Sequence, residues 1–430
     1  MATRAPLAVL PLTNIVRSLF TTSISSSSIL LPPSLAIMTA LANAKSPFLM
    51  PDRNPLLRFI LKHSFYAQFC AGENGPEVRR TIDSLKTIGF SGVILGYAKE
   101  VVLTEEQTKN LTACDEGAAG EECIRNEINP WAVGTMETVL LASPGDFVAL
   151  KFTGAGRQAL YSLSHRLAPS EALGSAIDSI CRLAADRGVR LLFDAEQQAV
   201  QAGIDDWTLA YMRKYNTATR AVIYGTYQAY LKATPRIVSE HLALARKEGF
   251  ALGVKLVRGA YIGSDPRALI HDTKADTDAA YDGVAARLLT RTWGAPLTAP
   301  EHNDNGTAGA FPEVQMVLAS HNQDSVRKAR ALLDGGARQT EVAFAQLQGM
   351  ADEVSCELVS VGKALSAAGD KTRFAPPAYK YLVWGSTGEC MKYLLRRAHE
   401  NRDAVQRTRN GRDAMRAELF RRVKALFGLA

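Results

Sequence analysis

The chain has 430 residues, of which 47% are hydrophobic and 22% are charged. This balance is typical of a globular protein and excludes a wholly disordered, collagen-like or disulfide-stapled chain. The net charge of +7 hints weakly at anionic partners, but it is unevenly distributed. From Lys392 to Lys424, eleven basic residues stand against four acidic ones, and residues 1–51 hold three basic residues and no acid. The body between these basic ends is therefore mildly acidic.

The first 51 residues have the composition of a mitochondrial targeting segment, because they are basic, rich in serine and threonine, and free of acid before Asp52. A secretory signal is disfavoured, since no compact apolar core directly follows a basic start. The apolar run 29–44 is expected to be broken at Pro32 and Pro33. It is also shorter than the roughly 20 residues that cross a bilayer. The sequence thus predicts a targeting segment at 1–51, a catalytic domain at 52–430 and no transmembrane helix.

The six cysteines are widely spaced, and even the closest pair, Cys114 and Cys123, does not form a CxxC redox or zinc motif. The seven histidines are scattered. Reduced, structural thiols are the favoured interpretation, and they fit an intracellular compartment. No metal site is predicted.

Eight short runs rich in β-forming residues recur along the body of the chain. They are Val93–Tyr97, Phe147–Lys151, Leu191–Asp194, Ala221–Tyr224, Val254–Val257, Val314–Ala319, Glu341–Ala345 and Tyr379–Val383. Continuous apolar strands that alternate with helices are typical of a parallel sheet with both faces covered. Eight of them favour a closed (β/α)8 barrel, with a doubly wound open sheet as the alternative.

Helical patterns fill most of the intervals between these runs, as in Leu160–Gly188 and Pro235–Gly249. The first interval, 101–146, is atypical, and its polar stretch Asp115–Glu122 is expected to form a surface loop. The turn Gly154–Gly156 lacks the third glycine of a dinucleotide-binding fingerprint, so it is only a weak nucleotide signal.

Polar residues recur where the predicted strands end, which is where barrel enzymes place their chemistry. Any one of them has a structural explanation as a helix cap or a solvated end, but the repetition at equivalent positions favours a site at the barrel mouth. The series is Lys151, Asp194, Glu196, Gln228, Lys255, Arg258, Gly259–Tyr261, His321, Asn322, Gln346, Leu347 and Tyr381.

A second feature is the adjacent pair Arg396 and Arg397, followed by Glu400. On a helix, residues three or four apart share a face, so Glu400 can orient either arginine. A solvated ion pair of ~0.3–0.5 kcal/mol is the simpler explanation. Two neighbouring guanidinium groups can instead grip a carboxylate bidentately. Composition alone leaves both readings open.

Several segments, taken in order, resemble the proline dehydrogenase family of the eukaryotic mitochondrial type. The resemblance covers roughly residues 60–405, and the ordered set is far more specific than any one motif. The segments are Leu191–Glu196, Tyr224–Lys232, Lys255–Tyr261, Ala319–Asn322, Phe344–Met350, Tyr379–Tyr381 and Tyr393–Asn401.

The resemblance implies a distorted (β/α)8 barrel that binds FAD non-covalently, with a final helix over the barrel mouth. It also implies a group of residues that face the flavin. These are Gln228, Lys255, Arg258, Gly259, Ala260, Tyr261, His321, Asn322 and Glu400. Bacterial members often have arginine at the position of Lys255, so the chain departs from them near the flavin's reactive edge.

On the substrate side, the resemblance implies that Arg396 and Arg397 clamp the proline carboxylate and that Glu400 orients them. Three side chains are expected against the pyrrolidine ring, namely Tyr261, Leu347 and Tyr381. The implied catalytic set is Lys151, Asp194, Tyr381, Arg396 and Arg397. Family members that prefer hydroxyproline tend to lack a tyrosine at the position of Tyr381, so its presence favours proline.

The implied reaction is oxidation of L-proline to Δ1-pyrroline-5-carboxylate, the first step of proline catabolism, by hydride transfer to FAD. The flavin supplies the chemistry, and the protein supplies orientation and electrostatics. The resemblance further implies a membrane quinone as electron acceptor and peripheral association with the matrix side of the mitochondrial inner membrane. An anionic membrane surface is also the first candidate partner for the basic stretch Arg402–Lys424.

Two rival functions can be weighed against this one. A Schiff-base aldolase could use Lys151 or Lys255 as nucleophile, but it leaves Arg396 and Arg397 without a role. A nucleic-acid-binding tail is disfavoured because its basic residues lack interleaved aromatics for base stacking. No nucleic-acid partner is therefore predicted.

Overall fold

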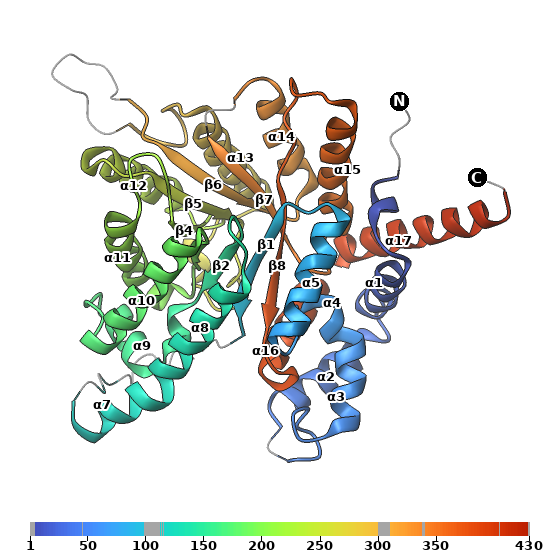
Figure 1. Cartoon of the computed structure of the whole chain (residues 1–430), viewed down its shortest axis with the longest axis horizontal. Helices are drawn as coiled ribbons and strands as arrows, with labels where there is room; N and C mark the ends of the chain where they lie inside the picture. The colour runs from blue at the N-terminus through green and yellow to red at the C-terminus, as the bar shows by residue number, and fades with distance from the viewer. Residues whose placement is uncertain are drawn as a thin grey trace. The chain divides into compact units, whose positions relative to one another are not determined.

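The computed structural model describes residues 5–44, 46–98, 112, 114, 116–299, 310–337, 340–403 and 405–428, except for the side chains of residues 400–407. Eight strands join in chain order into one closed barrel (Figure 1). Their bounds are β1 Gly92–Tyr97, β2 Phe147–Leu150, β3 Arg190–Phe193, β4 Ile223–Gln228, β5 Leu252–Val257, β6 Val314–Ala319, β7 Glu341–Leu347 and β8 Ala378–Trp384. The predicted (β/α)8 barrel is confirmed, and the open sheet is excluded.

All eight apolar runs became strands because nearly all of their side chains are buried. The pairings from β1 to β7 are parallel, as Leu150 opposite Phe193 and Val257 opposite Ala319 illustrate. Only β4 differs noticeably from the predicted run, Ala221–Tyr224, because the strand extends past Gly225 to Gln228. The apolar pattern stops at Gly225, but pairing with β5 continues to the end of the strand.

The chain divides into two compact units. The first comprises residues 1–93 and 346–430, and the second comprises residues 94–345. The second unit contains β2–β6, and helices α8–α14 lie on the outer side of these strands (Figure 1). Its helices are α7 Gly117–Cys123, α8 Asn129–Leu141, α9 Arg157–Ser164, α10 Glu171–Arg187, α11 Gln198–Tyr215, α12 Thr234–Glu248, α13 Lys274–Thr290 and α14 Gln323–Asp334.

Local signals explain where several of these helices begin and end. Ser170 caps α10 by accepting from the amide of Leu173, and Gly188 ends that helix in the left-handed conformation. The single helical stretch expected over Leu160–Gly188 is therefore two helices, α9 and α10. The other expected stretch, Pro235–Gly249, matches α12.

The expectation of a surface loop at Asp115–Glu122 is wrong for the described part, although Asp115 itself lies outside the described residues. A helix, α7, forms instead from Gly117 to Cys123. Cys123 is fully buried, and Arg157 of α9 bonds Glu127 at 2.6 Å just beyond this helix. Tertiary packing of this kind overrides the weak local propensity of a polar, glycine-containing stretch.

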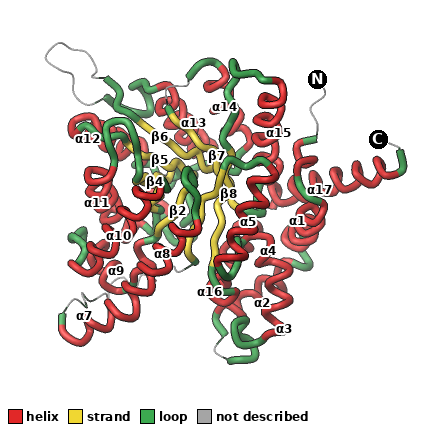
Figure 2. The backbone as a smooth tube through the Cα atoms, viewed as in Figure 1, coloured by secondary structure: helices red, strands yellow, loops and turns green. Residues whose placement is uncertain are grey.

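The first unit is almost entirely helical apart from β8 and the ends of β1 and β7 (Figure 2). Its helices are α1 Leu12–Ser25, α2 Leu31–Ala42, α3 Pro55–Leu61, α4 Ala67–Phe69, α5 Gly75–Ile88, α15 Asp352–Ala368, α16 Thr387–Asp403 and α17 Val405–Leu426. The two central prolines of the arm, Pro32 and Pro33, do not interrupt its apolar run. They occupy the first turn of α2, where a helix needs no backbone donor.

The N-terminal arm packs as part of the first unit. Ile15 of α1 is fully buried, and Leu7 and Leu10 are also in the core. Arg422 of α17 donates to the carbonyl of Leu10 at 2.7 Å, and Arg412 donates to Ser26 Oγ at 3.1 Å. Part of the basic charge near the C-terminus is therefore used in internal packing. Among the described residues, no helix is both long and apolar enough to cross a membrane.

Candidate active site

In the second unit, the structure brings together three of the predicted site residues. The ammonium of Lys255 lies 2.5 Å from Asp194 Oδ1, and the ammonium of Lys151 lies 3.5 Å from Asp194 Oδ2. Lys255 pairs in register with Thr226 of β4, which separates β3 from β5, so its side chain spans one strand to reach the carboxylate. The side chains of Lys255 and Asp194 are each 7% exposed. These residues form a buried cluster with two cations and one anion.

The main chain around this cluster is fixed by its neighbours. The indole nitrogen of Trp131 in α8 donates to the carbonyl of Lys151 at 3.0 Å, where β2 ends. The carbonyl of Leu150 accepts from the amide of Asp194 at 2.9 Å, which extends the β2–β3 pairing by one bond. Both site residues are therefore held by the backbone as well as by the ion pairs.

A second layer of hydrogen bonds links the loops that follow β2, β3 and β5. The Glu196 carboxylate accepts from the amide of Thr153 at 3.1 Å and from its hydroxyl. Gln228 Oε1 accepts from the amide of Ala260 at 3.0 Å, and Gln228 Nε2 donates to the carbonyl of Glu196 at 3.5 Å. Glu196 was noted in sequence as a strand-end residue, but Thr153 carries no signal that would have identified it.

The turn after β5 requires glycine at position 259. A Cβ there would lie 2.5 Å from the ring of Tyr230, which closes off one side of the turn. The Tyr230 hydroxyl donates to Asp265 at 2.5 Å, and the amide of Asp265 donates to the carbonyl of Tyr261 at 2.8 Å. Burial, followed by the bond to Asp265, raises the pKa of Tyr230 above its usual range. This turn, which carries Ala260 and Tyr261, is thus rigidly supported.

Arg258 and Asn322 are tied into the outer helices. The guanidinium of Arg258 bonds Asp278 of α13, and it donates to Ser325 Oγ at 2.8 Å and Ser320 Oγ at 3.3 Å. The side chain of Asn322 caps α14 by accepting from two amides. His321, beside it, is half-buried. That these three residues also face a flavin stays a prediction.

In the first unit, Tyr381 and Leu347 lie on adjoining segments. The carbonyl of Tyr381 accepts from the amide of Gln348 at 2.9 Å. Lys380, one position before Tyr381, is only 2% exposed and pairs with Asp352 at 2.7 Å. The Lys380 ammonium also donates to the carbonyl of Met350 at 3.2 Å. The sequence reading missed this lysine because its position in a strand gives no hint of its partner.

Arg396 and Arg397 lie on α16 of the first unit. Arg397 is 4% exposed, and its guanidinium lies 5.0 Å from the ring centroid of Tyr393, one turn earlier. Arg396 is half-buried. The side chain of Glu400 lies outside the described part of the chain. The arrangement of these residues relative to the Lys151–Asp194–Lys255 cluster stays a prediction.

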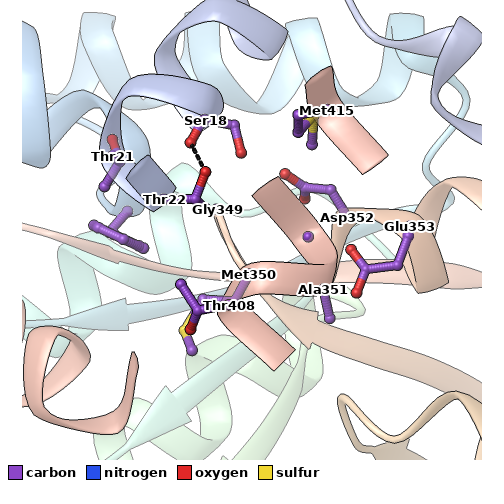
Figure 3. Close-up of a pocket in the computed structure, with 12 residues that line it drawn as sticks. Ser18, Thr21, Thr22, Gly349, Met350, Ala351, Asp352, Glu353, Thr408 and Met415 are labelled. Atoms are coloured by element: carbon purple, nitrogen blue, oxygen red, sulfur yellow. Dashed lines mark hydrogen bonds between the residues drawn. The ribbon is translucent and has the colours of Figure 1, made fainter. Parts of the chain in front are cut away.

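A small cavity of about 30 Å³ lies elsewhere in the first unit (Figure 3). It is bordered by Ser18 and Thr22 of α1, Asp352 and Glu353 at the start of α15, and Met415 of α17. This volume holds about two water molecules. None of the predicted site residues lines it. Among the described residues, no cluster of three histidine, cysteine or acidic side chains suits a metal ion.

A comparison with protein families matches residues 78–410 to the proline dehydrogenase family model. The chain belongs to the proline dehydrogenase family. It is 29% identical to a probable mitochondrial proline dehydrogenase of Schizosaccharomyces pombe, over 95% of this chain and 88% of the relative. It is 34% identical to the mitochondrial proline dehydrogenase 1 of Arabidopsis thaliana, over 85% of this chain and 76% of the relative. The resemblance seen in the sequence is confirmed.

A hydroxyproline dehydrogenase of Xenopus laevis is also similar, at 29% identity over 86% of this chain and 80% of the relative. Among solved structures, proline utilization A of Bdellovibrio bacteriovorus matches with a TM-score of 0.62 and 17% identity. That match covers 90% of this chain but only 38% of the longer bacterial chain, and it supports the fold. The chain is accordingly an enzyme that oxidises proline, the first step of proline catabolism, and its relatives are named mitochondrial.

Proposed function

We propose that the enzyme is FAD-dependent and converts L-proline to Δ1-pyrroline-5-carboxylate. The observation that carries this proposal is the buried cluster in which Lys151 and Lys255 flank Asp194. Two ammonium groups converge on one carboxylate in a place of low exposure. A buried cation stabilises the negative charge that an electron acceptor gains on reduction.

The residues present fit a flavin. Lys255, within β5, and Gln228, at the end of β4, are buried polar groups. The ring of Tyr230 leaves no room for a side chain at Gly259. Gln228, Lys255, Arg258, Gly259, Ala260, Tyr261, His321, Asn322 and Glu400 would hold the cofactor. FAD, when bound, accepts the hydride from the substrate. Lys255 would hold its proton toward that acceptor, with Asp194 fixing its position.

On the substrate side, Arg396 and Arg397 would bind the proline carboxylate, and Glu400 would orient them. Bidentate guanidinium–carboxylate pairs fix a ligand in distance and in angle. Leu347, Tyr261 and Tyr381 would pack against the ring and exclude water, and Lys151 and Asp194 would line the substrate side. Exclusion of water strengthens the charge interactions inside. Tyr381 supports proline as the preferred substrate over hydroxyproline.

The alternative of a Schiff-base aldolase loses support from the same cluster. Such an enzyme needs a neutral amine as nucleophile. The Lys255 nitrogen is instead engaged by Asp194 Oδ1 at 2.5 Å. A nucleic-acid-binding tail is also disfavoured, because Arg421 and Arg422 both pair with Glu418.

We also propose peripheral association with the matrix side of the mitochondrial inner membrane, and a membrane quinone as electron acceptor. The first unit supports this at the end of α17, where Phe420 and Leu426 are 60% and 83% exposed and lie among several basic residues. An amphipathic, basic surface binds anionic bilayers. Co-sedimentation with vesicles that contain anionic lipid tests this, and equal binding to neutral vesicles would contradict it.

The targeting signal is proposed to lie within residues 1–51, as the composition of this segment suggests. The activity itself is tested by incubating the purified enzyme with L-proline and a soluble quinone analogue. Δ1-Pyrroline-5-carboxylate should accumulate in step with reduction of the quinone. Product formed without added acceptor, or quinone reduced without product, would contradict the proposed reaction.

A further inference from the structure

The start of α16, the helix that carries Arg396 and Arg397, is held by carboxylates from the N-terminal part of the first unit. Glu73 Oε1 accepts from the amide of Thr387 at 3.1 Å and from its hydroxyl at 2.8 Å. Asp52 Oδ1 accepts from the amide of Gly388 at 2.9 Å. Two acidic side chains therefore bind the free amides at one helix N-terminus, where negative charge is favourable.

Glu73 is itself anchored on its other side. Its carboxylate pairs with Arg58 at 2.9 Å and with Lys62 at 2.6 Å, while its side chain is only 4% exposed. Burial alone would raise the pKa of Glu73, but the bonds from Arg58, Lys62 and Thr387 lower it to about 2. The carboxylate is therefore ionised at neutral pH and rigidly held between α3 and α16.

The contact with Asp52 depends on glycine at position 388. A Cβ at Gly388 would lie 2.3 Å from Asp52 Oδ2, so a larger residue would displace the carboxylate. The segment before α16 is fixed as well, because the Tyr66 hydroxyl donates to the carbonyl of Gly385 at 2.6 Å. Asp52 Oδ2 also accepts from the Ser386 hydroxyl at 2.9 Å. Together these bonds fix where α16 begins and how it is rotated about its own axis.

We propose that Glu73 and Asp52 are positioning residues for substrate binding, which set α16 so that its two arginines receive the proline carboxylate. The inference rests on the proposed roles of Arg396 and Arg397. Arg396 lies nine residues beyond Thr387, or about 13 Å along the helix axis. A tilt of about 10° at the start of α16 would therefore displace its backbone there by roughly 2 Å, enough to spoil a bidentate contact.

The test compares the KM for L-proline with kcat in full-length, FAD-loaded variants. Glu73→Gln removes the charge, and Thr387→Val removes the hydroxyl on the helix side without disturbing Glu73. Both should raise KM about tenfold while kcat stays within about twofold of wild type. Thr387→Ser, which keeps the hydroxyl, should restore KM. Ser170→Ala is the matched control, since it removes the cap of α10, and it should lower thermal stability without changing KM.

A double variant separates this inference from the proposed clamp. If Glu73 acts through the arginines, then Glu73→Gln should add little to the KM of Arg397→Met, because the two changes affect one contact. If Arg397→Met raises KM but Glu73→Gln and Thr387→Val lower only the melting temperature, the positioning role is wrong and the clamp stands. If Arg396→Met and Arg397→Met both leave KM unchanged, the clamp is wrong and the positioning role falls with it.

Discussion

Asp194 is the central residue of the cluster, because it holds two lysines, one directly after β2 and one within β5. An ion pair this poorly exposed is costly to break, since the remaining charge is left without its partner. Lys255 makes the shorter of the two contacts, at 2.5 Å. The register between β4 and β5 places this lysine opposite Thr226. The effect of this lysine on the reaction can be measured directly.

We expect Lys255→Met to slow reduction of the flavin by L-proline by about 10- to 100-fold, because it removes positive charge from the place where negative charge develops. Rapid-mixing absorbance under anaerobic conditions measures that rate. Lys255→Arg, which keeps the charge, should retain most of it. A Lys255→Met enzyme that is reduced as fast as wild type would show that this cation is not needed.

For Arg396→Met and Arg397→Met, we expect the KM for L-proline to rise on the order of 100-fold, while the FAD content stays near normal. A hydrogen bond to a charged group contributes about 1.5–3 kcal/mol, and every 1.4 kcal/mol changes affinity about tenfold. Arg416→Met, on an exposed position of α17, serves as the control and should not change KM. Steady-state kinetics decides the matter, and unchanged proline affinity would refute the clamp.

The strand-end residues could be predicted from the sequence because an apolar run marks its own end. Lys151 and Asp194 were found in this way, Lys255 was noted as a polar residue inside its run, and the structure joins the three. Glu73 could not be found, because its partners are Thr387, more than three hundred positions away, and basic residues of a helix with no distinctive pattern. Contacts of this kind depend on tertiary packing, which a single sequence does not reveal.

At the scale of elements, the link between β8 and the start of α15 depends on the buried Lys380–Asp352 pair. Lys380→Met should destabilise the protein by roughly 3 kcal/mol, since it leaves the Asp352 carboxylate without its partner. Denaturant unfolding measures the change. The double variant Lys380→Met/Asp352→Asn should recover part of the loss, because no unpaired charge remains. A double variant that is no more stable than Lys380→Met would contradict this account.

The anchoring of α16 by Glu73 predicts a dependence of stability on pH. The folded state lowers the pKa of Glu73 from 4.5 to about 2, so its contribution to stability is complete above pH 4.5 and is lost as the pH falls toward 2. The difference in melting temperature between wild type and Glu73→Gln should therefore shrink as the pH is lowered through this window. A constant difference would mean that Glu73 titrates alike in the folded and unfolded protein.

For whole helices and strands, the sequence was a better guide to the barrel than to its surroundings. Eight apolar runs predicted eight strands, because burial on both faces leaves a continuous hydrophobic signal. The helix α7 was missed, since its support comes from burial of Cys123 and from Arg157 of α9, which pairs with Glu122 of this helix and with Glu127 beyond it. Likewise, Pro32 and Pro33 were expected to break the apolar run 29–44, but they lie in the first turn of α2.

At the scale of the molecule, the charge of +7 is partly accounted for by packing. Arg422 bonds the carbonyl of Leu10, and Arg412 bonds Ser26, so basic residues near the C-terminus hold the N-terminal arm within the first unit. Arg396 and Arg397 have a proposed role in substrate binding. The remaining exposed basic residues of α17, together with its exposed Phe420 and Leu426, are the proposed membrane surface.

The central claim is that the chain is a flavoenzyme that takes a hydride from proline. The most direct measurement is the visible absorption spectrum of the purified protein under anaerobic conditions, before and after L-proline is added. We expect a flavin band that is bleached by L-proline and restored by a quinone analogue. A folded protein that binds no FAD, or a flavin band that L-proline leaves unchanged, would contradict the account.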